Sequence, residues 1–458
     1  MYSHEIQKIL DHGKISVGDR ILVEKGSKSY EGLLMPKTSH GDEKTVLVKL
    51  DSGYNIGIDI TDANISRSHI REPKDVADEA KYEFGRTSKE LLEIAFDANK
   101  PHVALISTGG TIASRVDYRT GGVYAVENPK ELLHNIPELS HIVNLEMFSP
   151  MKKMSEDLDP EDWQHLAREV AKELNAGKKG VIITHGTDTL HYTAAALSFF
   201  LQNLHKPVVL VGAQRSSDRG SSDAGMNLIC AAHVAVSDIA EVGTCMHGST
   251  SDDYCHFIRG TKVRKMHTTR RDAFRPINEP ALAKIYHSGR VEILNKNYRK
   301  RDDKKHVEVD AKIEPEVALL KVYPGADPKV IDFHVKNGVK GFVIEGTGMG
   351  HVPTDVAKKP WTLAIGKHAE TIPFVITSQT IFGRVNPYVY TNLRKLFTEA
   401  KAIPGEDMTS ETAYVKLMWV LGKTKSMEKI REMMLTSYAG EITPRTQADA
   451  FSAEGLNE

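Results

Sequence analysis

The chain has 458 residues, enough for two or three domains with sizeable cores. Hydrophobic residues make up 40% and charged residues 26%, which is the balance of an ordinary soluble protein. The formal net charge of −1 excludes a global attraction to nucleic acid or to an anionic membrane. No apolar run approaches the roughly 20 residues of a membrane span, and the first residues lack the apolar core of a signal peptide. We therefore expect a cytoplasmic protein without membrane contact.

The cysteines and histidines do not form a metal-binding pattern. Cys230, Cys245 and Cys255 are odd in number and lack a CxxC spacing, which predicts reduced thiols packed in the interior. No HExxH motif, paired CxxC or EF-hand loop occurs, so the 20 histidines are interpreted as core and surface residues. The sequence therefore predicts no metal and no cofactor bound to this chain.

The first 72 residues differ in pattern from the rest. Short alternating runs such as ISVGDRILVEKG and KTVLVKLDSG are separated by turns rich in Gly, Ser, Asp and Lys. This pattern is typical of antiparallel strands and predicts a small all-β, barrel-like domain. It contains no acid–base or nucleophile cluster, so it is interpreted either as a packing and solubility appendage or as a docking module for protein or RNA. The charged residues 73–100 are predicted to form a helical linker, interrupted by Gly85.

A buried strand after this linker leads into a glycine-containing loop. The run HVALIS at residues 102–107 is followed by TGGT at residues 108–111, which places hydroxyls around two glycines. Glycine permits positive φ and the close approach of a ligand, and ligands bind at the carboxyl ends of strands in open α/β sheets. The glycines could also simply turn a corner. Phosphate binding is disfavoured, because the loop lacks the third glycine of GxGxxG and the lysine of a P-loop.

A second loop of this kind follows about 75 residues later. The strand GVIIT at residues 180–184 ends in HGTDT, and an alanine-rich helical stretch comes next. Asp188 or Thr189 suits the N-cap of that helix. Capping accounts for one of these residues but not for the cluster of Thr187, Asp188 and Thr189. The two loops together therefore predict a chemical site rather than two plain turns.

Strand-like and helical segments alternate from residue 102 onward, which predicts a parallel sheet covered on both faces. Pro160 to Gly177 is predicted to be a helix that ends at its glycine. Apolar β-type runs lie at residues 142–147, 180–184, 207–211 and 241–246. The predicted organisation is a β-barrel-like domain at 1–72, a helical linker at 73–100, a catalytic α/β domain at 101–295, a charged linker or exposed hairpin at 296–314, a smaller α/β domain at 315–438 and an unpacked or partner-bound tail at 439–458.

The two loops carry a family resemblance. TGGTIAS at residues 108–114, followed by HGTDT, resembles the bacterial-type L-asparaginase family. Two further segments agree, PVVLVGAQRSSDRGSSDAGMNL and the stretch RGTKVRKMHTTRRDAF around Lys265. The resemblance covers roughly residues 100–435 and implies two asparaginase-like, parallel-sheet α/β domains. It does not extend to the first hundred residues.

The resemblance implies catalytic roles for five side chains. Thr111 takes the position of the primary nucleophile, and Tyr118 that of a lid tyrosine that accepts its proton. Thr187 takes the position of a second threonine, which forms a charge-relay-like set with Asp188 and Lys265. In such a set the lysine is held beside a desolvated carboxylate and a hydroxyl. Which threonine attacks in which half-reaction stays open.

The resemblance also implies how the charged head of an amino-acid substrate is bound. Ser155 takes the position that binds the α-carboxylate, and Glu156 falls where many extracellular members have Gln. Asp188 and Gly110 complete the predicted binding residues. A helix cap before DPEDWQ is the alternative interpretation of Ser155 and Glu156. Members of the family carry a subunit contact into the site, so at least a homodimer is implied.

The appended N-terminal region, the HGTDTL variant and the total length resemble one branch of the family, the glutaminase subunits of archaeal-type glutamyl-tRNA(Gln) amidotransferases. This implies hydrolysis of glutamine and transfer of the ammonia to a larger partner subunit. The partner would use ATP and magnesium to amidate Glu-tRNA(Gln) and would make the main contacts with the tRNA. The alternative is a free-standing cytosolic asparaginase or glutaminase with an appended domain. A non-enzymatic RNA-docking scaffold is disfavoured, because Thr111, Thr187, Asp188 and Lys265 are all present.

Overall fold

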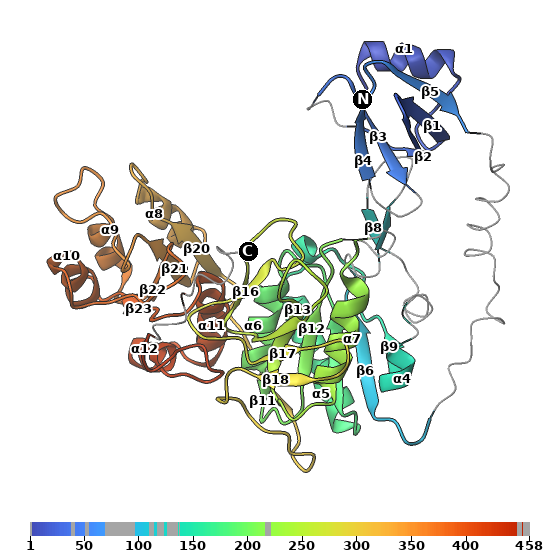
Figure 1. Ribbon diagram of the computed structural model, residues 1–458. Helices are drawn as coiled ribbons and strands as arrows, with labels where there is room; N and C mark the ends of the chain where they lie inside the picture. Colours follow the sequence, from blue (N-terminus) through green and yellow to red (C-terminus); the bar gives the residue numbers. More distant parts are fainter. Residues whose placement is uncertain are drawn as a thin grey trace.

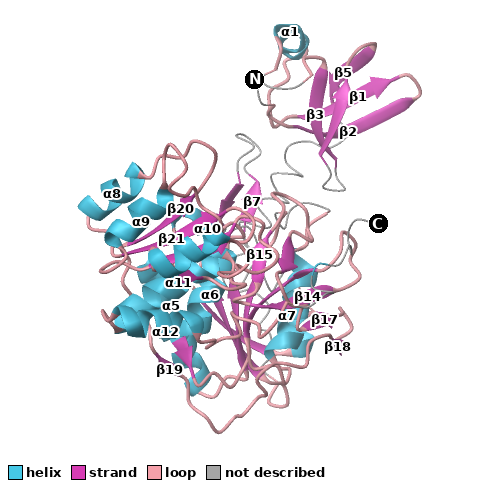
Figure 2. Cartoon of the chain, turned by 90° about the vertical axis from the view of Figure 1, so that its left-hand side faces the viewer, coloured by secondary structure: helices cyan, strands magenta, loops and turns pink. Residues whose placement is uncertain are grey.

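The described part of the chain forms an N-terminal antiparallel sheet and two α/β units (Figures 1 and 2). No helix within this part is both long and apolar enough to cross a membrane. The computed structural model describes residues 2–37, 42–50, 55–68, 97–109, 114–116, 123–125, 136, 138–215, 221–446 and 451.

Five antiparallel strands and one helix make up the N-terminal region, at the top of Figure 1. Ile21 and Val23 alternate with less buried residues and enter the core, as the strand pattern predicts. The structure adds helix α1 (His4–His12), which packs Ile6 and Leu10 into the same core. The strands are, in the order of the sheet, β4 (Asn55–Asp59), β3 (Thr45–Leu50), β2 (Lys28–Leu34), β1 (Arg20–Lys25) and β5 (Ala63–Arg67).

An eight-stranded sheet forms the centre of the larger α/β unit. Its neighbouring strands run parallel from β9 to β13, as predicted, because short β-branched runs alternate with helices. The strands β14, β17 and β18 run antiparallel, so the complete sheet is mixed. In the order of the sheet the strands are β18 (Val291–Ile293), β17 (Ala283–Ile285), β14 (Cys255–Arg259), β13 (Val242–His247), β12 (Val208–Val211), β10 (Gly180–Thr184), β6 (His102–Ser107) and β9 (Asn144–Phe148).

Helices cover both faces of this sheet. On one face α5 (Pro160–Asn175) packs against α6 (Leu190–Phe200), and on the other lies α7 (Ala224–Ala235) (Figure 2). The short helix α4 (Leu139–Ile142) packs beside α7. Gly177 follows α5 with a φ of 100°, so the predicted glycine stop is confirmed. Coverage on both faces explains why β10 and β12 are buried along their whole length.

The smaller α/β unit has a four-stranded parallel sheet. One of its faces packs against α8, α9, α10 and the π-helical segment η3, and the other against α11 and α12. The strands are β20 (Val317–Lys321), β21 (Gly341–Gly346), β22 (Phe374–Ser378) and β23 (Ile403–Pro404). The helices are α8 (Lys329–Lys336), α9 (Trp361–His368), α10 (Thr391–Arg394), η3 (Lys395–Glu399), α11 (Ser410–Lys423) and α12 (Met427–Leu435).

Helix α11 joins the two α/β units. It packs against the small sheet on one side and against α6 on the other (Figure 1). Every residue from Ser410 to Leu421 except Tyr414 is buried. One hydrophobic core continues from the large sheet through α11 to Val343 and Val375 of the small sheet. The packing of α11 therefore sets the relative position of the two units.

Residues 296–314, predicted as a charged linker or an exposed hairpin, pack against the larger unit. Within them β19 (Glu308–Val309) pairs with β11 (Leu201–Gln202), and Val307 is buried. Arg301 donates hydrogen bonds to three backbone carbonyls of the larger unit. The charged composition does not predict this packing, because the sequence does not distinguish an arginine that binds carbonyl groups from one that is exposed to solvent.

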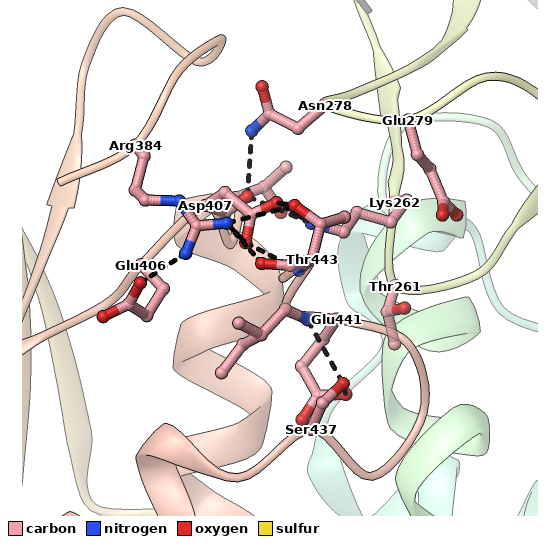
Figure 3. Close-up of polar contacts among 12 residues, drawn as sticks. Thr261, Lys262, Asn278, Glu279, Arg384, Glu406, Asp407, Ser437, Glu441 and Thr443 are labelled. Carbon is pink, nitrogen blue, oxygen red and sulfur yellow. Dashed lines mark hydrogen bonds and ion pairs between the residues drawn. The ribbon is translucent and has the colours of Figure 1, made fainter. Parts of the chain in front are cut away.

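The predicted tail also begins inside the fold. Ala439, Glu441 and Thr443 are buried, and Glu441 pairs with Lys416 at 2.7 Å. Thr443 donates through its backbone N–H and its hydroxyl to Asp407 (Figure 3). The expectation of an unpacked or partner-bound tail is therefore wrong for residues 439–443.

Gly180 at the start of β10 provides a test of the packing between strand and helix. We expect Gly180→Ala to lower the free energy of unfolding by about 1–3 kcal/mol, because an added Cβ would overlap the carbonyl oxygen of Ala235. Gly225→Ala in α7 is the matched control, since an added Cβ there meets no described atom within 4 Å and alanine favours a helix. Thermal unfolding of both variants checks this, and an unchanged midpoint for Gly180→Ala would contradict it.

Candidate active site

The two glycine–threonine loops meet at one edge of the large sheet. Their strands β6 and β10 are parallel neighbours, with Ser107 paired to Thr184. Thr108 donates its backbone N–H (3.0 Å) and its hydroxyl (3.1 Å) to the carbonyl of Thr184. Gly109 has a φ of 108°, and a Cβ there would lie 2.5 Å from the carbonyl oxygen of Lys153. The first loop therefore requires glycine, because the chain after β9 lies directly against it.

Part of the first loop lies outside the described residues. This applies to Gly110, Thr111 and Tyr118, whose predicted roles stay predictions. The chain is described again in a hairpin of β7 (Ser114–Val116) and β8 (Val123–Ala125), which pair antiparallel.

The structure brings together Thr187, Asp188 and Lys265. The ammonium of Lys265 donates to the hydroxyl of Thr187 at 2.9 Å and to a carboxylate oxygen of Asp188 at 2.7 Å. Thr187 is buried, and the side chain of Lys265 is 11% exposed. The side chain of Asp188 is 64% exposed, so the expected desolvation of this carboxylate is not found in the single chain. Lys265 therefore bridges the buried Thr187 hydroxyl and the exposed Asp188 carboxylate by hydrogen bonds to both.

Lys265 reaches the loops from outside the large sheet. It ends β15 (Val263–Lys265), which pairs with β16 (Phe274–Pro276) in a two-stranded hairpin. Thr187 also packs against the residue that follows β12, since a Cβ on Gly212 would lie 2.8 Å from its methyl group.

Ser155 packs against the second loop. It begins the 3₁₀ turn η2 (Ser155–Asp157) and is buried, and a Cβ on Gly186 would lie 2.8 Å from its Oγ. Thr189 stands at the N-cap position of α6, but its hydroxyl donates to the carbonyl of Ser155 at 2.6 Å and makes no cap bond. Glu156 is exposed beside it. The side chain of Thr189 thus ties two loops together instead of capping a helix.

The N-cap of α5 is Asp159, the first residue of DPEDWQ. Its carboxylate accepts from the N–H groups of Glu161 (2.9 Å) and Asp162 (3.2 Å), and its own N–H donates to Asp162. Ser155 and Glu156 make none of these bonds. The capping interpretation of Ser155 and Glu156 is therefore wrong, and their side chains are not used to start α5.

Two buried histidines support the second loop. The ring nitrogens of His185 lie 2.6 Å from the Gly186 carbonyl and 2.8 Å from the Thr193 hydroxyl. Burial lowers the pKa of His185 to about 4, and burial together with the cation Arg264 lowers the pKa of His191 to about 3. Both rings are therefore neutral at pH 7, and His185 holds the loop by its hydrogen bonds to Gly186 and Thr193.

A partly buried ion pair beside this cluster involves residues that were not predicted from the sequence. Arg264, which precedes Lys265, donates to Glu411 of α11 at 3.0 Å, and Nε2 of His191 lies 3.9 Å from the same carboxylate oxygen. Glu411 is 4% exposed, and burial raises its pKa. No local pattern in SETAYVK marks Glu411, because its partner is far away in the chain.

The described residues contain no group of three or more His, Cys, Asp and Glu side chains placed to hold a metal ion. Cys230, Cys245 and Cys255 are buried free thiols, which confirms that they are packed in the interior.

Three family descriptions match the chain in succession. "GatD N-terminal domain" matches residues 15–67, "Asparaginase, N-terminal" residues 102–299, and "Glutaminase/Asparaginase C-terminal domain" residues 316–434. The N-terminal sheet and both α/β units therefore each correspond to a known family region.

Two similar proteins that match almost the whole chain are both glutamyl-tRNA(Gln) amidotransferase D subunits. The glutamyl-tRNA(Gln) amidotransferase D subunit of Pyrococcus abyssi is 50% identical over 451 residues, covering 97% of this chain and 99% of the relative. That of Methanothermobacter thermautotrophicus is 44% identical, covering 98% and 99%. Among solved structures, the thermostable L-asparaginase from Thermococcus kodakarensis has 32% identity and a TM-score of 0.66, covering 75% of this chain and all of that chain. L-asparaginase I from Vibrio cholerae has 28% identity and a TM-score of 0.64, covering 75% and 99%.

The buried His185 predicts a specific acid sensitivity. Its pKa falls from 6.5 in the unfolded chain to about 4 in the folded one, so between these values the unfolded chain binds a proton that the folded chain does not. The free energy of unfolding therefore falls as the pH drops from about 6.5 toward 4, by about 1.4 kcal/mol per pH unit for this group. His185→Gln is expected to reduce this slope, measured by denaturant unfolding between pH 7 and 5. His141→Gln, at an exposed position, is the control, and equal slopes in all three proteins would contradict the prediction.

Proposed function

The chain belongs to the family of glutamyl-tRNA(Gln) amidotransferase D subunits, and from this premise we propose that it is the glutaminase component of a tRNA-dependent amidotransferase. In this proposal it hydrolyses glutamine to glutamate and supplies the ammonia with which a partner subunit converts Glu-tRNA(Gln) to Gln-tRNA(Gln). The observation that carries the chemical part is the contact of Lys265 with both Thr187 and Asp188 on an asparaginase-type fold.

Hydrolysis of a carboxamide needs a nucleophile, a proton acceptor and an oxyanion site. We assign Thr111 as the primary nucleophile and Tyr118 as the lid residue that accepts its proton. The hydroxyl oxygen adds to the amide carbon, the nitrogen leaves as ammonia after gaining a proton, and water hydrolyses the resulting ester to glutamate. Thr187, Asp188 and Lys265 form the second set, in which Lys265 exchanges a proton with the hydroxyl 2.9 Å away.

The head of the substrate is assigned to the surface between the loops. Ser155 would bind the α-carboxylate, and Glu156 and Asp188 would bind the α-ammonium, with Gly110 lining the same place. The exposure of both Glu156 and Asp188 supports this assignment, since a bound ammonium group can reach their carboxylates. Their charge favours a substrate that carries a free amino group.

The N-terminal region favours this function over that of a free-standing asparaginase or glutaminase. The two solved L-asparaginases each cover 75% of the chain, whereas the amidotransferase subunits of Pyrococcus abyssi and Methanothermobacter thermautotrophicus cover 97% and 98% of it, and the family description for residues 15–67 is that of the N-terminal domain of such subunits. The assembly we propose contains at least a homodimer and a larger amidotransferase subunit. ATP and magnesium would be used by that subunit, which would also make the main contacts with Glu-tRNA(Gln).

The catalytic assignment predicts the effect of two substitutions. Thr111→Val and Lys265→Met are each expected to lower glutamine hydrolysis by about 10³-fold or more, because they remove a nucleophile and a proton-exchanging group. The measurement is glutamate release by the purified complex, together with thermal unfolding to establish that the variants are folded.

Lys265→Arg is the control for charge. It keeps a cation near Asp188, but a guanidinium does not give up its proton near neutral pH, so turnover is expected to stay low. Wild-type activity in Lys265→Arg would make the lysine an electrostatic contact only. A Thr111→Val protein that keeps more than about a tenth of the turnover would contradict the assignment of the nucleophile.

The amidotransferase function predicts that hydrolysis is coupled to the acceptor. A glutaminase that supplies ammonia gains nothing from hydrolysing glutamine when no Glu-tRNA(Gln) is present. We expect weak hydrolysis by the chain alone and an increase of about tenfold or more with the larger subunit and Glu-tRNA(Gln), which a population shift of a few kcal/mol can produce. Ammonia release is measured for the chain alone, with the partner, and with the partner plus tRNA.

Removal of residues 1–72 separates the role of the N-terminal region from the chemistry. The shortened chain is expected to keep its residual hydrolysis but to lose complex formation or the acceleration by tRNA. Equal rates in all three conditions with the full chain would overturn the coupled function and favour a plain amidohydrolase.

A further inference from the structure

The strand that carries Lys265 lacks the support that other site strands have. Among the described strands, β15 pairs only with β16 in a hairpin, whereas β6 and β10 each have a neighbouring strand on both sides in the eight-stranded sheet. A two-stranded hairpin is marginal in isolation. The position of Lys265 therefore depends on what else holds β15.

Successive side chains of β15 point to opposite sides, as in any strand. Lys265 contacts Thr187 and Asp188 on one side. On the other side Lys262, just before the strand, pairs with Asp407 at 2.7 Å, and Arg264 pairs with Glu411 at 3.0 Å. Two ion pairs to the start of α11, from Arg264 and from Lys262 in the turn before β15, thus hold this segment to the smaller unit.

Both carboxylates belong to the segment that starts α11. Thr409 is the N-cap of this helix, so Asp407 lies just before it and Glu411 in its first turn, four residues apart. Asp407 is 2% exposed and its partner Lys262 fully buried. Since α11 is packed between the two units, these carboxylates are fixed relative to the large sheet. Removing one member of a pair so deeply buried leaves an uncompensated charge and is strongly destabilising.

Asp407 also holds the second strand of the hairpin (Figure 3). The side-chain amide of Asn278, two residues after β16, donates to the Asp407 carbonyl at 2.9 Å. Asn278 has a φ of 63° and Glu406, beside Asp407, a φ of 55°. A left-handed backbone conformation at a residue other than glycine is unfavourable and is kept only where the surrounding contacts hold it. Such positions cluster at functional sites.

We propose that Asp407 and Glu411 are positioning residues for Lys265. They hold β15 so that the Lys265 ammonium lies 2.9 Å from the Thr187 hydroxyl. The proposal rests on the proposed function, in which Lys265 takes part in the chemistry. It also means that the smaller unit controls the amidohydrolase site through α11, although the site lies at the edge of the large sheet.

Glu411→Ala tests the proposal against a matched control. Glu441→Ala likewise removes a buried carboxylate from an ion pair. Its partner, Lys416 at 2.7 Å, is on α11 and not on the hairpin. In the full chain with its partner, Glu411→Ala is expected to lower kcat about tenfold or more with KM changed by less than about threefold, because a displacement of about 1 Å at a reacting group has effects of this size. Glu441→Ala is expected to lower thermal stability but to keep kcat within about twofold.

A double-mutant cycle shows whether Glu411 acts through Lys265. In the Lys265→Met background, Glu411→Ala is expected to lower the residual rate by less than about twofold, because the group it positions is already gone. A structural role would give the same fold loss in both backgrounds and would overturn the proposal, as would a wild-type kcat in Glu411→Ala. If Glu411→Ala does not fold, Arg264→Met breaks the same pair from a side chain that is 27% exposed and is judged by the same criteria.

The same experiment distinguishes failure of the proposal from failure of the proposed function. Wild-type turnover in Lys265→Met alone would remove Lys265 from the chemistry, whatever Glu411→Ala does. An inactive Lys265→Met with a fully active Glu411→Ala would leave the function intact and reject only the positioning role.

Discussion

Parallel pairing of β6 with β10 is the constraint on which the candidate active site depends. Neighbouring parallel strands end at the same edge of a sheet, so the pairing of Ser107 with Thr184 forces the two following loops together. The bond from Thr189 to the Ser155 carbonyl then attaches the loop after β9. Because these strands are buried on both faces, this edge cannot rearrange without opening the core. The described residues of these loops therefore form a base onto which the remaining groups are placed.

Lys265 is added to this base from a hairpin outside the large sheet. Its position is set on one side by Thr187 and Asp188 and on the other by the ion pairs that its neighbours make with the start of α11. Helix α11 is itself fixed by the core that the two α/β units share. The relative arrangement of the two units thus determines where the Lys265 ammonium lies, because buried charges tolerate few alternative positions.

Burial divides the site into a neutral support and an anionic surface. His185 and His191 are neutral because burial lowers their pKa values to about 4 and 3. Asp188 and Glu156 remain exposed. A substrate that carries an ammonium group, as glutamine does in the proposed function, meets carboxylates at the surface and no buried cationic histidine beneath them.

Short-range patterns in the sequence determined the strands at 102–107 and 180–184, the loops after them and the alternation that predicts a sheet covered by helices. The association of Asp188 with Lys265 came from family resemblance, because no spacing rule connects residues that are 77 positions apart. The structure alone decided that Arg301 and Glu441 are packed rather than parts of a linker and a tail. The pairing of distant charges depends on how the whole chain folds, and neither partner carries a local signal of it.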